Sequence, residues 1–177
     1  MFDLCPNIIN TSDLKQIGLL SDNHGYLDDR IIEHFKHCDE IWHAGDIGTI
    51  QNLEILESRK PLRAVYGNID GLQLRSVLPE IQRFFCEQVE VLIKHIGGYP
   101  GNYDRSIRET IKKDPPDLFI SGHSHILKVM PDKKLNLLHI NPGAAGKNGF
   151  HKVRTIVRFI IDGKDIQDLE VIELGPR

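Results

Sequence analysis

The feature that most constrains the fold is a series of short apolar segments that each end in polar residues, mostly beside glycine. The segment Lys15–Leu20 runs into "SDNHG", and three later segments run into "HAGD", "YGNID" and "SGHSH". A fifth, "VEVLIKH", ends in His95. Taken from His24, these ends follow at positions 46, 68, 95 and 123, at intervals of 22 to 28 residues. Each interval has roughly the length of one strand with its crossover connection, which predicts strands alternating with helices.

The two halves of the chain differ in pattern. In the first half, 27–38 and 49–60 repeat apolar residues at helical intervals between short apolar strands, which favours parallel pairing in an α/β sheet. In the second half, 81–95 resembles two strands that turn near Glu87-Gln88, and 103–114 resembles a helix. Hairpins are predicted over 127–143, around Pro131-Asp132, and over 154–174, at Asp162-Gly163. We therefore expect two packed sheets with helices outside them.

Length and composition limit the classes of protein to consider. A chain of 177 residues suits one domain, which we place at residues 15–177, preceded by an N-terminal extension, 1–14. The net charge of −3 gives no sign of the broad basic surface of a nucleic-acid binder. Three widely spaced cysteines form neither a disulfide framework nor a metal knuckle, so we expect a cytoplasmic location. No segment resembles a membrane span or a signal peptide.

Polar side chains gather at the predicted strand ends. Seven carry nitrogen or oxygen donors: Asp22, His24, Asp46, Asn68, His95, His123 and His125. The carboxyl ends of parallel strands lie at one edge of a sheet, where open α/β folds bind ligands. Imidazole together with carboxylate and amide oxygen, without thiolate, indicates metal. Seven donors are more than one transition ion normally takes, and they suit two ions that share a bridging carboxylate.

In this order, "SDNHG", "HAGD", "GN", "H" and "GHSH" resemble the D-x-H, G-D, G-N, H, G-H-x-H pattern of the calcineurin-like metallophosphoesterase superfamily. The short chain and its "HINPGAAG" tail are similar to the small bacterial and archaeal phosphodiesterase branch, to which the retromer's phosphoesterase-like subunit is related. The resemblance covers residues 17 to about 174. It implies an α/β fold in which a two-sheet β-sandwich is flanked by helices, in four α/β/β/α layers. It also implies one ion held by Asp22, His24 and His125, a second held by Asn68, His95 and His123, and Asp46 bridging the two.

The function expected from this resemblance is metal-dependent hydrolysis of a small phosphate ester, with a phosphodiester as the first choice. Two divalent ions would supply a hydroxide for in-line attack on phosphorus. Manganese is the expected metal, while iron, zinc and nickel accept the same ligands. Since ligating histidines must be neutral, we expect activity to fall below about pH 6.5.

One position departs from the family pattern. In the phosphatase branches "G-N-H" supplies a histidine that protonates the leaving group, but here Ile69 stands at that place. Asp70 is the neighbouring candidate for a proton donor, and the amide of Asn68 is expected to donate to a phosphate oxygen. We therefore expect diesters with good leaving groups as substrates. The predicted substrate contacts are Asn23, Asn68 and Tyr99.

Two other functions are possible for a chain with this pattern, and three of the histidines outside the donor set have other expected roles. A protein-binding scaffold with the same fold is the main alternative, and a nuclease is disfavoured because no aromatic-basic cluster marks a strand-binding groove. We expect His43 and His139 to be structural and His151 to be an exposed loop residue. The sequence leaves the oligomeric state open.

Overall fold

The computed structural model describes residues 14–177, and these form two five-stranded sheets. The strand order is β12-β11-β1-β2-β3 in the first sheet and β4-β5-β8-β10-β9 in the second. Residues 1–13 of the predicted extension, with Cys5, lie outside the described residues. The elements are β1 (Lys15–Leu20), α1 (Asp29–Phe35), β2 (Glu40–His43), α2 (Ile50–Arg59), β3 (Leu62–Ala64), α3 (Leu72–Val77), β4 (Ile81–Cys86), β5 (Val89–Lys94), β6 (Gly98–Tyr99), β7 (Asn102–Tyr103), α4 (Arg108–Lys113), β8 (Leu118–Ile120), β9 (Lys128–Asp132), β10 (Leu137–Asn141), β11 (Val153–Asp162) and β12 (Asp165–Pro176).

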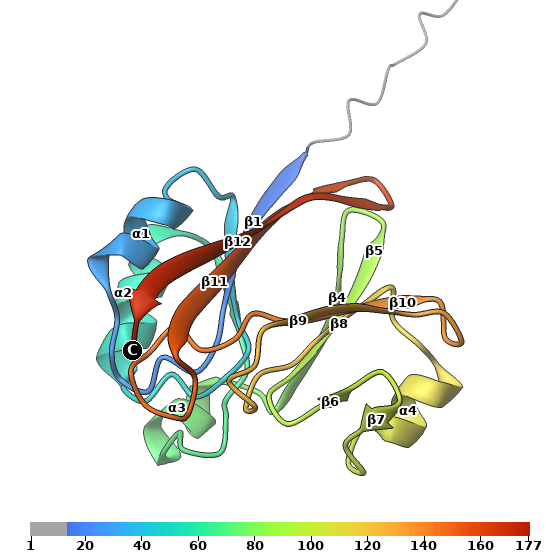
Figure 1. Cartoon of the computed structure of the whole chain (residues 1–177), viewed down its shortest axis with the longest axis horizontal. Coiled ribbons are helices and arrows are strands. Elements are labelled where there is room, and N and C mark those ends of the chain that lie inside the picture. The colour runs from blue at the N-terminus through green and yellow to red at the C-terminus, as the bar shows by residue number, and fades with distance from the viewer. Residues whose placement is uncertain (1–13) are drawn as a thin grey trace, which may run out of the picture.

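Three hydrophobic clusters define the layers. The central cluster lies between the sheets and joins Leu19 and Trp42 of the first to Val91 and Ile120 of the second. A second cluster packs α1 against the outer face of the first sheet, and a third packs α4 against the second sheet. Figure 1 shows α1 and α2 on one side of the sandwich and α4 on the other. The predicted four-layer α/β/β/α fold is confirmed.

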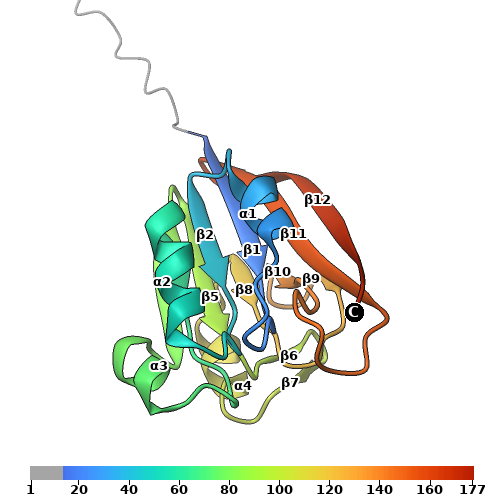
Figure 2. The ribbon, with the colours of Figure 1, turned by 90° about the vertical axis from the view of Figure 1, so that its left-hand side faces the viewer.

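Parallel pairing within each sheet directs several strand ends to the same region. In the first sheet β1, β2 and β3 are parallel, and in the second β5, β8 and β10 are parallel. Figure 2 shows β1 and β2 running side by side from the top of the molecule towards its lower edge. The polar strand ends come from two sheets, so the site forms where two sets of parallel strands meet. Among the described residues, no helix has both the length and the apolar character needed to cross a bilayer.

Some elements differ from the sequence-based prediction. The helix α3 and the strand β6 lie in segments for which the apolar pattern gave no prediction. The helix predicted over 103–114 is shorter in the structure, because Tyr103 belongs to β7 and α4 begins only at Arg108. The predicted hairpin turn at Pro131-Asp132 lies instead at residues 133–136, because both residues belong to β9. Its turn is fixed by the carboxylate of Asp132, whose Oδ1 accepts hydrogen bonds from the backbone N–H groups of Lys134 and Leu135.

A buried ion pair fastens α1 to the end of the chain. Asp28 is the N-cap of α1, and its Oδ2 lies 2.9 Å from Nη1 of Arg154, whose side chain is only 2% exposed. The same guanidinium donates to the carbonyl oxygens of Leu174 and Pro176 in β12. Hydrogen bonds from Arg30, with a smaller contribution from Arg154, hold the pKa of Asp28 well below the ordinary carboxyl value. The charged form of Asp28 is therefore the one that the fold stabilises.

We expect Asp28→Asn to lower the free energy of unfolding at pH 7 by about 3 kcal/mol, because it leaves a buried guanidinium without its counterion. Since the pKa of Asp28 is lower in the folded state, its contribution is present above about pH 4 and is lost as the pH falls further. Urea unfolding at pH 7 and pH 3 measures both effects. Asp29→Asn, at an exposed site one residue along, is the control. Equal stabilities of the two variants at pH 7 would contradict the prediction.

Candidate metal centre

The structure brings all seven predicted donors into one chain of close contacts. His125 contacts both Asp22 and His24. Its Nε2 lies 3.1 Å from Nε2 of His24 and 3.2 Å from Oδ1 of Asp22. Asp46 Oδ2 lies 3.6 Å from His24 Nε2 and 3.3 Å from His95 Nε2. The remaining donors follow: Asn68 Oδ1 lies 3.0 Å from His95 Nε2 and 2.8 Å from His123 Nδ1.

The first group has the geometry of a cation site. Asp22, His24 and His125 each present one donor atom, and these atoms lie within 4.8 Å of one another. Two nitrogen atoms as close as those of His24 and His125 require a proton or a cation between them. Two ligands that are each about 2.1 Å from one ion are separated by about 3.0–3.4 Å at octahedral to tetrahedral angles. The observed 3.1 Å falls in that range.

A second group of donors includes Asp46 itself. Asp22, Asp46 and His95 again place donor atoms within 4.8 Å of one another, and all three residues are buried. Asn68 and His123 extend this group towards solvent, where both are exposed. Oδ2 of Asp46 is therefore near histidines of both groups, which is the position that a bridging carboxylate would occupy.

The backbone at these strand ends adopts an uncommon conformation. Eight non-glycine residues of the described chain have positive φ, and five of them are donors: Asp22, His24, Asp46, His123 and His125, with φ of 48° to 65°. This left-handed region is unfavourable for residues that carry a Cβ, and such strain clusters at functional sites. Its concentration in five of the seven donors indicates that the surrounding structure holds them for function rather than for packing alone.

Hydrogen bonds from the backbone fix the orientation of the donors. Nδ1–H of His95 donates to the carbonyl oxygen of Ala44 over 2.8 Å, which leaves its Nε2 lone pair facing Asp46 and Asn68. Asp46 uses Oδ1 to accept from the N–H of Ile69, 3.0 Å away, and so keeps Oδ2 for the centre. The carboxylate of Asp22 accepts from the N–H of His123 at 3.1 and 3.2 Å. The second sheet is thereby linked to the first.

Two glycines let the backbone come this close. At Gly67 an added Cβ would lie 2.0 Å from Oδ1 of Asp46. At Gly45, which has φ of +97°, it would lie 2.6 Å from Nδ1 of His95. Only glycine fits either position without displacing a donor.

Neighbouring charges and hydrogen bonds lower the pKa of Asp46 and raise the pKa values of His95 and His125. Burial raises the pKa of Asp46, but the hydrogen bond and charge of His95 outweigh it, so the net pKa is lowered. For His95 burial lowers the pKa, and the two carboxylates of Asp46 and Asp22 outweigh it, so the net pKa is raised. The hydrogen bond with Asp22 raises the pKa of His125. The site therefore attracts positive charge to its imidazoles, and protons and cations compete for the same nitrogen atoms.

Behind the donors, His43 supports the first two strand ends. Its Nε2 lies 2.8 Å from Oδ1 of Asn23, and its Nδ1 accepts from the N–H of Gly45. Burial lowers the pKa of His43 to about 4, so the ring is neutral. Asn23, the predicted substrate contact, is fully buried, and its Oδ1 is directed to His43. Both residues position the loops that carry the donors.

The structure gives Asp70 a different role from the predicted proton donor. Its carboxylate is buried and accepts hydrogen bonds from three backbone N–H groups, those of Ile47, Gly48 and Gly67. These groups lie beside Asp46 and Asn68, so Asp70 joins the loops after β2 and β3. A carboxylate occupied in this way positions the loops that carry the donors. The side chain at the usual place of the proton donor, Ile69, is 44% exposed and has no proton to give.

Two further residues near the centre were not identified from the sequence. His151 is half-buried rather than exposed, and its ring centroid lies 5.3 Å from that of His125. Asn141, at the end of β10, donates to the carbonyl oxygen of Gly122 and to Oγ of Ser124. It therefore holds the "GHSH" segment on both sides of His123. No ligand pattern marked either residue, because their roles depend on contacts between distant loops.

Two cavities flank the donors. One of about 590 Å³ borders His123 and includes Tyr99, the predicted substrate contact, which is 38% exposed. The other, of about 410 Å³, borders Asn68 and His95. Ile96 and Asp104 line both. The centre is thus open to ligands from two sides.

Known proteins resemble this chain in sequence and in fold. Residues 16–164 match the calcineurin-like phosphoesterase superfamily domain. A probable metallophosphoesterase of Methanothermobacter thermautotrophicus is 28% identical over 169 residues, which are 90% of this chain and 92% of that protein. An archaeal phosphodiesterase of known structure has a TM-score of 0.70 at 23% identity, covering 90% of this chain and 99% of its own. Vps29 of Chaetomium thermophilum has a TM-score of 0.70 at 15% identity, covering 92% and 100%.

Proposed function

The chain belongs to the calcineurin-like phosphoesterase superfamily, and from this premise we propose that it hydrolyses phosphodiesters with two divalent cations held by the seven donors. Metal-dependent phosphoester hydrolysis is the activity of the family. The preference for diesters, the number of cations and the role of each residue are what we propose. Asp22, His24 and His125 would hold one cation, Asn68, His95 and His123 the other, and Asp46 would contact both.

The observation that carries the proposal is the position of Asp46 between the two groups of donors. Its Oδ2 lies 3.6 Å from His24 Nε2 and 3.3 Å from His95 Nε2, so one oxygen faces a histidine of each group. When bound, two divalent cations activate water as the nucleophile and neutralise the charge of the phosphate oxygens. Manganese remains the metal that we propose, because the mixture of imidazole and oxygen donors suits it.

The side chains of this protein would bind and orient the ester. Oδ1 of Asn68 faces His95 and His123, which leaves its exposed amide Nδ2–H₂ to donate to a phosphate oxygen. With Ile69 at the proton donor's place and Asp70 occupied by backbone N–H groups, neither residue protonates the leaving oxygen. Esters whose leaving groups depart without protonation are therefore the preferred substrates. The two cavities give each of the two ester arms of a diester a place to lie.

A protein-binding scaffold is the second candidate, since the solved neighbours of the same fold include Vps29. The donor set argues against it: every position of the family's ligand pattern carries a residue able to bind metal, and these residues converge. A scaffold would have no need of five residues in left-handed backbone at this point.

The test uses the purified chain, stripped with a chelator and reloaded with Mn²⁺. We expect two cations per chain by elemental analysis and faster hydrolysis of bis-p-nitrophenyl phosphate than of p-nitrophenyl phosphate. A second chelation should abolish activity, and Mn²⁺ should restore it. Failure to take up metal at neutral pH would favour the scaffold, whereas faster hydrolysis of the monoester would refute the preference for diesters.

A further inference from the structure

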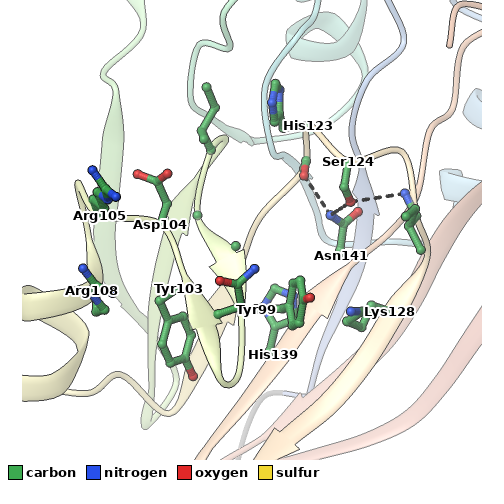
Figure 3. A pocket seen from close by; sticks show the side chains of 16 residues that line it. Tyr99, Tyr103, Asp104, Arg105, Arg108, His123, Ser124, Lys128, His139 and Asn141 are labelled. Carbon is green, nitrogen blue, oxygen red and sulfur yellow. Dashed lines mark hydrogen bonds between the residues drawn. The ribbon is translucent and has the colours of Figure 1, made fainter.

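The larger cavity beside the centre has the size of a site for a small organic ligand. Its volume is about 590 Å³, within the range of roughly 300–1,000 Å³ that is usual for such sites. His123 borders it on the side of the donors, and its other walls come from the loop after β5, the start of α4 and the strands β9 and β10. Figure 3 shows these side chains around the cavity.

Cations line this cavity on two sides. Arg105 and Arg108 lie on one side and Lys128 on the other (Figure 3). Within the described part of the chain, Arg105 makes no ion pair, and Arg108 has only Glu109, 3.7 Å from its Nε. Lys128 lies over the ring of Tyr99, with its Nζ 3.3 Å from the ring centroid, and pairs with no described carboxylate. These cations are therefore available to an anionic ligand.

One carboxylate, that of Asp104, lines the same cavity, and its Oδ1 accepts hydrogen bonds from the N–H and the hydroxyl of Ser106. With histidines neutral, the lining residues carry a formal charge of +2, although the whole chain carries −3. The positive charge is thus concentrated in the cavity. Arginine side chains suit the planar, bidentate recognition of phosphate or carboxylate.

The inner wall of the cavity is held in place before any ligand arrives. Nδ1–H of His139 donates to the carbonyl oxygen of Phe119, and burial lowers the pKa of this histidine to about 4. The ring is neutral, so its Nε2 can accept a hydrogen bond from a hydroxyl or N–H group of a ligand. Asn141 is fixed by its bonds to Gly122 and Ser124. The cavity therefore offers a ligand both a fixed hydrogen-bond acceptor, Nε2 of His139, and the cations named above.

The smaller cavity differs in its charges. Lys94 is buried and pairs with Glu80, while Arg75 donates to the carbonyl oxygens of Gly67, Asn68 and Asp70. The described cations of this cavity are therefore already bonded within the protein. Of the two cavities, the one beside His123 contains the cations Arg105 and Lys128, which make no ion pair with the described residues, so the two sides of the centre suit different groups.

We propose that the cavity lined by Arg105, Arg108 and Lys128 binds a second phosphate, carried by one ester arm of the phosphodiester substrate. This inference rests on the proposed function and narrows its substrate class to diesters with an additional anionic group. The smaller cavity takes the other, uncharged arm. Phosphodiesters without a second anion bind less tightly, because the three cations then lack an anionic ligand.

The test compares two chromogenic substrates on the Mn²⁺-loaded protein. One is the p-nitrophenyl ester of thymidine 5′-monophosphate, and the other is the same ester with an additional 3′-phosphate. We expect kcat/KM to be about tenfold higher for the second ester, the equivalent of one good charge-assisted contact. The double variant Arg105→Ala/Arg108→Ala should bring this ratio close to one. The control Lys133→Ala/Lys164→Ala removes two exposed cations that do not line the cavity, and it should keep the ratio.

A binding measurement separates this inference from the proposed function. Calorimetry on the Mn²⁺-loaded protein compares thymidine 3′,5′-bisphosphate with thymidine 5′-monophosphate and requires no turnover. Equal kcat/KM for the two esters, or a preference that survives in Arg105→Ala/Arg108→Ala, overturns the second-phosphate site while phosphodiesterase activity stands. If neither ester is hydrolysed, the proposed function fails and calorimetry decides on the second-phosphate site. Tighter binding of the bisphosphate than of the monophosphate, lost in the double variant, supports the site. Equal binding of the two nucleotides overturns it.

Discussion

Replacing Asp46 with alanine is expected to lower kcat/KM for bis-p-nitrophenyl phosphate by about a thousandfold, the largest effect that we expect of any single substitution. Asp46 Oδ2 faces His24 in one group of donors and His95 in the other. Loss of this carboxylate removes a ligand from both proposed cations at once. It also leaves fewer negative charges to offset two divalent ions. Elemental analysis should therefore find no more than one tightly held Mn²⁺ per chain.

Asp46→Asn tests the same prediction with less disturbance of the fold. Its side-chain oxygen can still accept the hydrogen bond from the N–H of Ile69 that Oδ1 accepts now. We expect a stability near that of the parent chain, together with a loss of activity and of metal close to that of Asp46→Ala. Asp29→Ala, at an exposed position, serves as the control and should keep full activity. Two Mn²⁺ ions per chain with undiminished activity in Asp46→Asn would show that Asp46 does not bridge.

Replacing Asp70 with alanine is expected to cost about 3 kcal/mol or more of unfolding free energy, because it leaves three N–H groups near the centre without their acceptor. Those groups belong to Ile47, Gly48 and Gly67, in the loops that carry Asp46 and Asn68. We expect activity to fall as well, since the two loops lose the side chain that joins them. Urea unfolding and kcat/KM measure the two effects on the same preparation.

A series of aryl phosphodiesters distinguishes this positioning role from proton donation. If Asp70 positions the loops, its replacement should reduce kcat/KM by the same factor for every ester. A proton donor matters more for poor leaving groups, so the factor would rise with the pKa of the departing phenol. An unchanged unfolding free energy combined with such a rise would restore Asp70 as the acid.

The predicted donors could be found from the sequence because each follows a short apolar strand at a regular interval. The rule that parallel strands bring their carboxyl ends together then required only that these strands pair, as β1, β2 and β3 do in one sheet and β5 and β8 in the other. The sequence did not reveal that the donors come from two sheets. Their meeting depends on the packing of the central cluster, which includes Trp42 and Val91.

The roles of Asp70 and Asn23 could not be predicted, because a side chain next to a ligand in sequence can point in several directions. The place of Asp70 after Asn68 predicts an acid, yet its carboxylate turns to backbone N–H groups from two loops. Asn23 lies between two donors but is directed towards His43 on the neighbouring strand. Only the three-dimensional positions of these partners decide where the two side chains point.

The amino-acid sequence by itself determined the kinds of donor, their order and the strand ends from which they project, because these follow from local pattern and from the pairing of parallel strands. The tertiary structure alone decided which oxygen lies between the two groups of donors, which carboxylate is occupied by backbone N–H groups, and where unpaired cations gather. The physical reason is that hydrogen bonds and ion pairs depend on separations of about 3 Å. Such separations are set by the packing of segments far apart in the chain.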